Sequence, residues 1–183
     1  KKLGVRDWDA AKVEASFGAA EVAKYNKAVA DGKVYNYEDE LFGEKGILNT
    51  TRLSINGGTE KFGYYAGVTR KSEDGIVKNT GYDKTSVRLN LDPKLFKWAD
   101  LQINLNYVNS ESDRGYFNND NTSTTLGVSY VSTPSWADLF PDAQGNYPNN
   151  AYAPSNFLQT RDLITNKEKV DRVLGGGIGT FHL

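Results

Sequence analysis

Residues 101–110 read LQINLNYVNS, and residues 84–91 read KTSVRLNL. In both segments apolar and polar side chains alternate, as Ile103, Asn104 and Leu105 illustrate. Because successive side chains of a strand point to opposite faces, this period of two predicts strands with one apolar and one polar face. We therefore expect the two segments to be neighbouring strands of one sheet.

The same alternation extends to a meander of four strands over residues 47–110. Its first two predicted strands are residues 49–56 and 62–70. The turn between them is Gly57–Lys61, where glycines permit the positive φ that tight hairpins require. The third strand is expected to end at Pro93, because proline cannot donate a hydrogen bond to the ladder.

The remaining residues are expected to flank this meander with less regular structure. We predict a short helix, broken near Gly18, within a loop over residues 1–46. A long loop over residues 111–168, holding a short strand at 126–131, leads to a further strand in residues 169–183. The predicted fold class is therefore all-β, an antiparallel meander with a short helix and long loops.

Composition excludes several classes of function. The net charge of −1 over 183 residues provides no basic surface for nucleic acid. The chain has no Cys and a single histidine, His182, so neither a thiolate nor a histidine-cluster metal site is expected, and no cofactor is implied.

Hydropathy leaves the cellular location open. No segment approaches the ~20 apolar residues of a spanning helix, and the chain does not begin with the apolar core of a signal peptide. The ~9–11-residue strands of transmembrane barrels give only a weak hydropathy signal, so a membrane location is compatible with the sequence. Because the chain contains no Met, not even at its start, we expect it to be a piece of a longer protein.

Six segments share an order and spacing with one protein family. They are Tyr37–Phe42, Leu53–Lys61, Tyr64–Gly67, Asp74–Asn79, Val87–Asp92 and Asn166–Gly175. Together they resemble the early barrel strands of SusC-like TonB-dependent outer-membrane transporters. The resemblance covers residues 35–110 well and residues 167–175 more weakly, about half of the chain.

The resemblance implies a large transmembrane β-barrel of about 22 strands with a plugged lumen, located in the bacterial outer membrane. It implies import of oligosaccharides or peptides, a SusD-like surface lipoprotein as partner, energy relayed by the TonB complex, and outer-membrane lipid around the barrel. It implies no enzyme activity. Since five or six strands cannot close even the smallest barrels of ~8 strands, we expect this chain to be part of a longer transporter.

The resemblance also orients the strands. It implies periplasmic turns at Gly57–Lys61 and Asp92–Asp100, and extracellular loops at residues 71–83 and 111–168. The row implied to face lipid is Leu89, Leu91, Leu101, Ile103 and Leu105. The row implied to face the lumen is Arg88, Asn90, Gln102, Asn104 and Asn106.

Two sets of side chains are candidate ligand contacts. Aromatic faces stack on sugar rings and apolar peptide side chains, which makes the aromatic residues of the long loop the first set: Tyr116, Phe117, Tyr130, Trp136, Tyr147 and Tyr152. Their commoner role is to pack the loop against itself or its lid. The second set is Arg52, Arg88, Asn104 and Asn106, whose alternative role is contact with the barrel wall or plug.

Two other functional classes are alternatives to the transporter. In a soluble secreted β-sandwich or carbohydrate-binding module, the apolar rows would face a second sheet. Such a fold needs a covering sheet within the chain, whereas a barrel leaves the faces of Leu89 and Leu105 bare. Asp138 and Asp142 supply the two carboxylates that glycoside hydrolysis requires, but nothing in the sequence positions them as a pair, so no catalytic site is expected.

Overall fold

A computed structural model describes residues 8–116 and 125–182 of the 183-residue chain. The chain divides into two compact units, each built from segments that are distant in sequence. The sheet unit consists of Gly46–Gly75, Thr80–Asp113 and Lys167–Leu183. The helical unit consists of Lys1–Lys45, Ile76–Asn79 and Arg114–Asn166.

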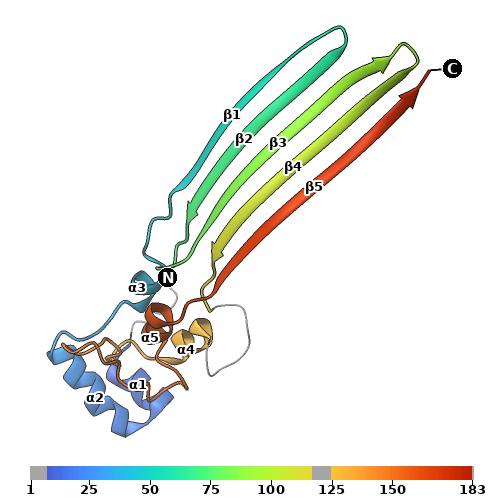
Figure 1. The fold of residues 1–183 in the computed structure, drawn as a ribbon. Coiled ribbons are helices and arrows are strands. Elements are labelled where there is room, and N and C mark those ends of the chain that lie inside the picture. Colours follow the sequence, from blue (N-terminus) through green and yellow to red (C-terminus); the bar gives the residue numbers. More distant parts are fainter. Residues whose placement is uncertain (1–7, 117–124, 183) are drawn as a thin grey trace. The chain divides into compact units, whose positions relative to one another are not determined.

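The sheet unit is one antiparallel meander of five strands in the order β1-β2-β3-β4-β5 (Figure 1). Its strands are β1 (Leu48–Thr59), β2 (Phe62–Asp74), β3 (Gly81–Phe96), β4 (Ala99–Asp113) and β5 (Lys167–Phe181). The sheet is open, with β1 and β5 at its edges. The predicted fold class, mostly β with an antiparallel meander and short helices, is confirmed.

The register of the strands sorts the side chains onto two faces. Leu89 lies opposite Leu105 across the β3–β4 ladder, and the adjacent pair is Arg88 opposite Asn106. Because neighbouring pairs point to opposite sides of a sheet, we call the side of Leu89 the apolar face and the side of Arg88 the polar face. The alternation in the sequence thus produces two chemically distinct surfaces.

Strand β3 continues through Pro93, and the prediction that it ends there is wrong. Pro93 lies opposite Phe62 of β2, while the ladder to β4 passes from the pair Leu91–Ile103 to the pair Lys94–Asp100. Pro93 has no backbone N–H to donate, but it lies between these two pairs, where β3 and β4 are not paired, so no hydrogen bond of that ladder is lost. Proline therefore interrupts one ladder without ending the strand.

The connections between strands also differ from the predicted loops. Because β2 runs to Asp74 and β3 begins at Gly81, their connection is shorter than the predicted loop over residues 71–83. Likewise, β4 runs to Asp113 and β5 begins at Lys167. The segment between β4 and β5 belongs to the helical unit.

The described residues of the helical unit form five short helices. They are α1 (Ala10–Phe17), α2 (Ala19–Ala30), α3 (Tyr37–Phe42), α4 (Leu126–Ser132) and α5 (Phe157–Leu163). The predicted break at Gly18 is confirmed: this glycine has φ +89°, a conformation open to glycine, and separates α1 from α2. Among the described residues, no helix is both long and apolar enough to cross a membrane.

Helix α4 replaces the strand predicted at residues 126–131, and that prediction is wrong. Its buried residues are Leu126, Ser129 and Tyr130, which have the spacing of one helical face. Burial of this face decides the conformation, although the segment is rich in residues that also suit a strand.

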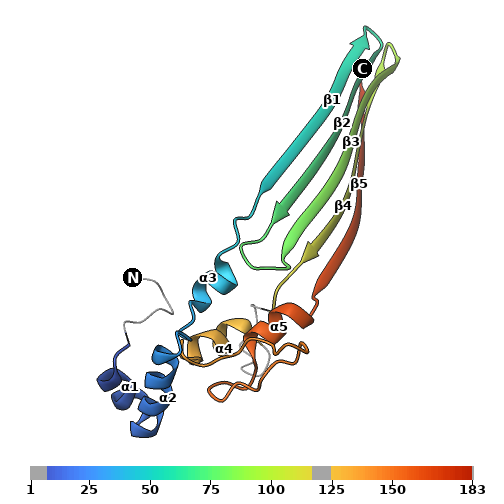
Figure 2. The same ribbon diagram turned by 90° about the vertical axis from the view of Figure 1, so that its left-hand side faces the viewer.

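Figure 2 shows the ribbons of the helices, and two clusters of buried side chains hold the helical unit together. The larger cluster draws on α3, α4 and α5: its members are Tyr37, Leu41, Leu126, Tyr130, Leu139, Phe157 and Leu158. The smaller cluster joins α1 and α2 to the segment after α4 through Val13, Ala28 and Trp136. Side chains from both ends of this unit's sequence therefore meet in each core.

Candidate functional site

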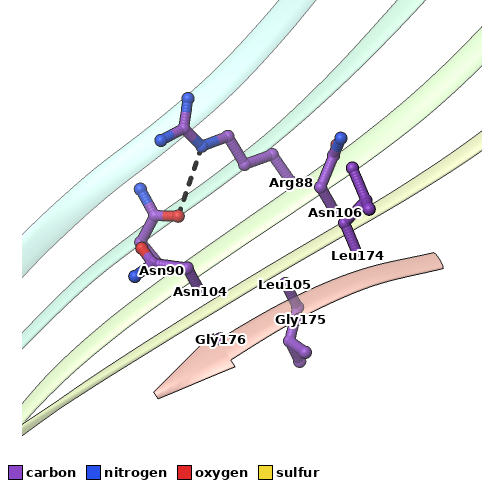
Figure 3. A pocket seen from close by; sticks show the side chains of 8 residues that line it. All are labelled: Arg88, Asn90, Asn104, Leu105, Asn106, Leu174, Gly175 and Gly176. Carbon is purple, nitrogen blue, oxygen red and sulfur yellow. Dashed lines mark hydrogen bonds between the residues drawn. The ribbon is translucent and has the colours of Figure 1, made fainter. Parts of the chain in front are cut away.

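A hollow of about 320 Å³ lies on the sheet, where β3, β4 and β5 run side by side (Figure 3). Its lining residues are Arg88, Asn90, Asn104, Leu105, Asn106, Leu174, Gly175 and Gly176. Three of them, Arg88, Asn104 and Asn106, are residues that the sequence predicted as ligand contacts. The register brings these three together: Arg88 lies opposite Asn106, and Asn104 is two residues further along β4.

Glycines of β5 leave the space that forms this hollow. Gly176 lies opposite Asn104 on the polar face, and a Cβ built on it would meet no heavy atom within 4 Å. Leu174, opposite Asn106, closes the next position along β5. Sequence reasoning missed both residues as lining. Alternation of side chains along β5 could have identified them, because it puts residues 174 and 176 on the face opposite to residues 175 and 177.

Arg88 provides the positive charge of the hollow. Its Nε donates a hydrogen bond to Oδ1 of Asn90, at 3.2 Å, which turns the guanidinium along the polar face (Figure 3). Asn90 in turn lies opposite Asn104 across the β3–β4 ladder. The hollow thus combines one guanidinium with three carboxamides, and each carboxamide can both donate and accept hydrogen bonds.

Further cations lie on the same face beyond the hollow. The register puts Arg52 of β1 and Arg172 of β5 in one cross-strand row, two residues along the strands from Arg88. Lys84 occupies the polar face of β3 one row further on. Within the part of the chain that the structure describes, none of these four cations is in an ion pair.

The apolar face carries its charges differently. Arg70 and Asp83 pair at 2.6 Å. Lys167 pairs with Asp113 at 3.1 Å, and Lys169 pairs with Glu111 at the same separation. These charges therefore have direct partners. On the polar face Lys71 pairs with Glu73 at 2.5 Å, whereas Arg52, Lys84, Arg88 and Arg172 have no ion-pair partner among the described residues and can meet an external anion.

The loop aromatics predicted as ligand contacts lie in the helical unit, in separate places. Tyr130 is buried in the larger cluster and Trp136 in the smaller one. Tyr147 is half-buried and donates a hydrogen bond to Asp162 at 2.7 Å, whereas Tyr116 is exposed. Phe117 lies outside the described residues. Tyr147 packs against the cluster that holds Tyr130, and Tyr152 donates to the same carboxylate as Trp136, so these four rings divide between two cores instead of forming one binding surface.

Glu21 is a buried carboxylate at the centre of the smaller cluster. It accepts hydrogen bonds from Nε1 of Trp136 at 3.1 Å, from Nζ of Lys24 at 2.9 Å and from the hydroxyl of Tyr152. Burial acts to raise the pKa of Glu21, but the hydrogen bonds from these three side chains outweigh it and the pKa is lowered. The carboxylate is therefore charged and fully partnered, as expected of a structural group.

Asp138 and Asp142 are also held by local contacts. Asp138 accepts from the backbone N–H of Phe140 at 3.3 Å and faces Lys33 at 3.4 Å. Asp142 accepts from the backbone N–H of Asn146 at 2.8 Å, and this bond is the main reason that its pKa is lowered. Both carboxylates thus fix turns of the helical unit.

Comparison with known proteins finds a partial similarity to a TonB-dependent receptor. No protein-family model matches the chain. The chain is 32% identical over 88 residues to a protein of Formosa agariphila described as TonB-dependent receptor P26. That similarity covers 48% of this chain and 9% of the receptor's length, so the chain corresponds to a small part of that relative.

Proposed function

We propose that this chain is a stretch of the barrel wall of a SusC-type TonB-dependent transporter in the bacterial outer membrane. The transporter takes up oligosaccharides or peptides. The observation that carries this proposal is the bare apolar face of the sheet unit. The similarity to a TonB-dependent receptor supports the same class of protein.

The apolar side chains of the strands have no protein cover. Leu53 and Ile55 of β1 are 68% and 63% exposed, and Val173 of β5 is 74% exposed. Among the residues of the five strands, Ala99 alone is buried. The described residues contain no second sheet that could cover this face, as a β-sandwich requires. Lipid would cover it instead.

Aromatic rings bound the apolar face at one end. Phe96 and Trp98 stack with their ring centroids 5.1 Å apart, and Trp98 stacks on Phe181 at 6.0 Å. From there the apolar row of β4 runs over the nine residues Ala99–Tyr107, which fits the ~9–11 residues of a tilted membrane strand. Aromatic residues at the ends of such strands favour the membrane interface.

The partners of the whole transporter follow from this class. A SusD-like surface lipoprotein would act as the lid, and the TonB complex would act through parts of the transporter outside this chain. The turns joining β1 to β2 and β3 to β4 would be periplasmic, and residues 111–168 extracellular. In this arrangement the polar face lines the lumen.

A charge placed on one face of β4 tests the proposal. Ile103 lies at the middle of the apolar row, so Ile103→Arg in the full-length protein would put a guanidinium near the bilayer midplane, at a cost of ~2–4 kcal/mol. We expect less folded protein in the outer membrane, measured by heat-modifiable mobility of membrane fractions. The matched control is Asn104→Arg, one residue along the strand and on the polar face, which should leave the yield near that of the native protein.

Equal yields for the two variants would contradict the proposal. So would a greater loss for Asn104→Arg, because that result would put the polar face against lipid. A soluble, folded product of the full-length gene would favour the β-sandwich.

A further inference from the structure

We propose that the hollow lined by Arg88, Asn90, Asn104 and Asn106 is a binding subsite for an anionic sugar, one that carries a carboxylate or a sulfate. This inference rests on the proposed function, because it takes the polar face as the surface that imported solutes pass. It adds a substrate class to that function: acidic oligosaccharides in preference to neutral ones.

The charge of the polar face is the first argument. Arg52, Arg88 and Arg172 lie within two neighbouring cross-strand rows, and Lys84 lies in the next row. The polar face of residues 84–90 and 102–110 carries no acidic side chain. Asp92 is the first acid reached along β3, two residues beyond Asn90. A concentration of one charge sign raises the local concentration of the opposite ion.

The state of the Arg88 guanidinium is the second argument. Only its Nε is committed, to Asn90, so the two Nη groups are available. A guanidinium presents its N–H groups as a planar fork that matches the two oxygens of a carboxylate or sulfate. An incoming anion would therefore be held without breaking an existing ion pair.

The three carboxamides are the third argument. Asn90, Asn104 and Asn106 each offer a donor and an acceptor, which suits the hydroxyls of a sugar, since these also donate and accept. The volume of about 320 Å³ is near the lower end of the range for small-molecule sites, the size of a sugar unit. The backbone N–H and C=O groups of an acidic peptide can also pair with carboxamides, so an acidic peptide is the competing ligand that the experiment includes.

Binding to the full-length protein in detergent tests this subsite. The probes are trigalacturonate, a sulfated galactose trimer and the neutral trimer galactotriose, with hexaglutamate as the peptide probe. We expect at least one anionic sugar to bind at least tenfold more tightly than galactotriose, and its affinity to fall as salt is raised.

Two variants locate the binding at the hollow. Arg88→Gln removes the charge and should weaken binding of the anionic sugar about tenfold or more, the loss expected for a hydrogen-bonded charge pair. Gly176→Leu fills the open space beside Asn104 and should weaken all sugars while retaining Arg88. The controls are Arg70→Gln and Gly177→Leu, the same substitutions on the apolar face, which should leave affinity unchanged.

Several outcomes would overturn the inference. One is equal binding of galactotriose and both anionic trimers, and another is an equal loss for Arg70→Gln and Arg88→Gln. Tighter binding of hexaglutamate than of either anionic sugar would assign the face to acidic peptides. A protein that assembles normally in the outer membrane yet binds none of the probes refutes this subsite alone, whereas failure of the Ile103→Arg comparison refutes the barrel wall.

Discussion

The helical unit and the sheet unit bury their side chains in different ways. In the helical unit, Val13, Phe157 and Leu158 are completely buried, and polar groups such as Glu21 are buried with hydrogen-bond partners. In the sheet unit the apolar side chains lie open on one face, and Leu53 is typical of them. The helical unit contains its own core, whereas the described residues provide no cover for the apolar face of the sheet.

The two units therefore differ in the source of their stability. Side-chain packing and buried hydrogen bonds stabilise the helical unit in water. Backbone ladders specify the register of the sheet, but its apolar face gains free energy only where something apolar covers it. Substitutions of apolar residues should therefore affect the two units unequally.

The largest expected effect is that of Phe157→Ala. Phe157 packs edge-on against Tyr37, with ring centroids 4.9 Å apart, and also contacts Tyr130. Removing this fully buried ring should lower the local free energy of unfolding of the helical unit by about 3–5 kcal/mol. Hydrogen exchange of the helical segments in the full-length protein measures this loss. Leu53→Ala, the exposed control, should leave that exchange unchanged; comparable losses would show that the helical core is not independent.

A smaller effect is expected from Arg161→Gln. The buried guanidinium of Arg161 pairs with Glu40 and with Asp162, each at 2.8 Å. In the variant the two carboxylates face a neutral glutamine amide instead of the guanidinium. We expect the local free energy of unfolding of the helical unit, measured by the same hydrogen exchange, to fall by about 1–3 kcal/mol.

The control for Arg161→Gln is an exposed ion pair of the same unit. Lys27 and Asp31 pair at 2.6 Å in solvent, where water screens the interaction, so Lys27→Gln should cost clearly less stability than Arg161→Gln. If the two substitutions cost the same, burial of Arg161 does not contribute to the stability of the helical unit.

The smallest effect concerns pH and Glu21. Since its pKa is lowered in the folded unit, Glu21 contributes stability that is fully present above its ordinary pKa of 4.5 and is lost as the pH falls through the lower pKa of the folded unit. Glu21→Gln should therefore flatten the fall in stability as the pH drops below the ordinary pKa of this carboxyl. The urea midpoint, followed by fluorine NMR of labelled Trp136, provides the measurement. An unchanged slope would show that other carboxylates govern acid unfolding.

The sheet was predictable because its signal is local. Alternation along residues 84–91 and 101–110 specifies which side chains share a face, and the register follows from pairing like rows with one another. The end of β3 was mispredicted because Pro93 lies where the β3–β4 pairing is interrupted, so its missing N–H does not end the strand. The other strand ends were mispredicted because pairing with the neighbouring strand, not local residue preference, decides how far each strand extends.

The helical unit was much less predictable because its contacts are not local. The backbone N–H of Tyr35 donates to the carbonyl of Ser135, and Trp136 donates to Glu21 across 115 positions of the sequence. Nothing in the alternation of residues 126–131 shows that a distant partner buries one helical face there. A single sequence therefore did not reveal α4.

The candidate site was predictable only where its residues come from strands that are adjacent in the sequence. Arg88, Asn104 and Asn106 follow from the polar row of two adjacent strands. The contributions of Leu174 and Gly176 depend on β5, which the chain reaches only after the helical unit, so their place beside Asn104 required the register.

The helical unit is assembled from three separate segments of the chain, so long loops must close before it can form. Tyr37 donates its hydroxyl hydrogen to the carbonyl of Ala137, which is 100 residues away. Closing so long a loop in a disordered chain costs about 3 kcal/mol more entropy than closing a four-residue turn. The hairpins of β1–β4 shorten this loop by bringing its ends together first. The meander should therefore form early, and the helical unit should close as a late step.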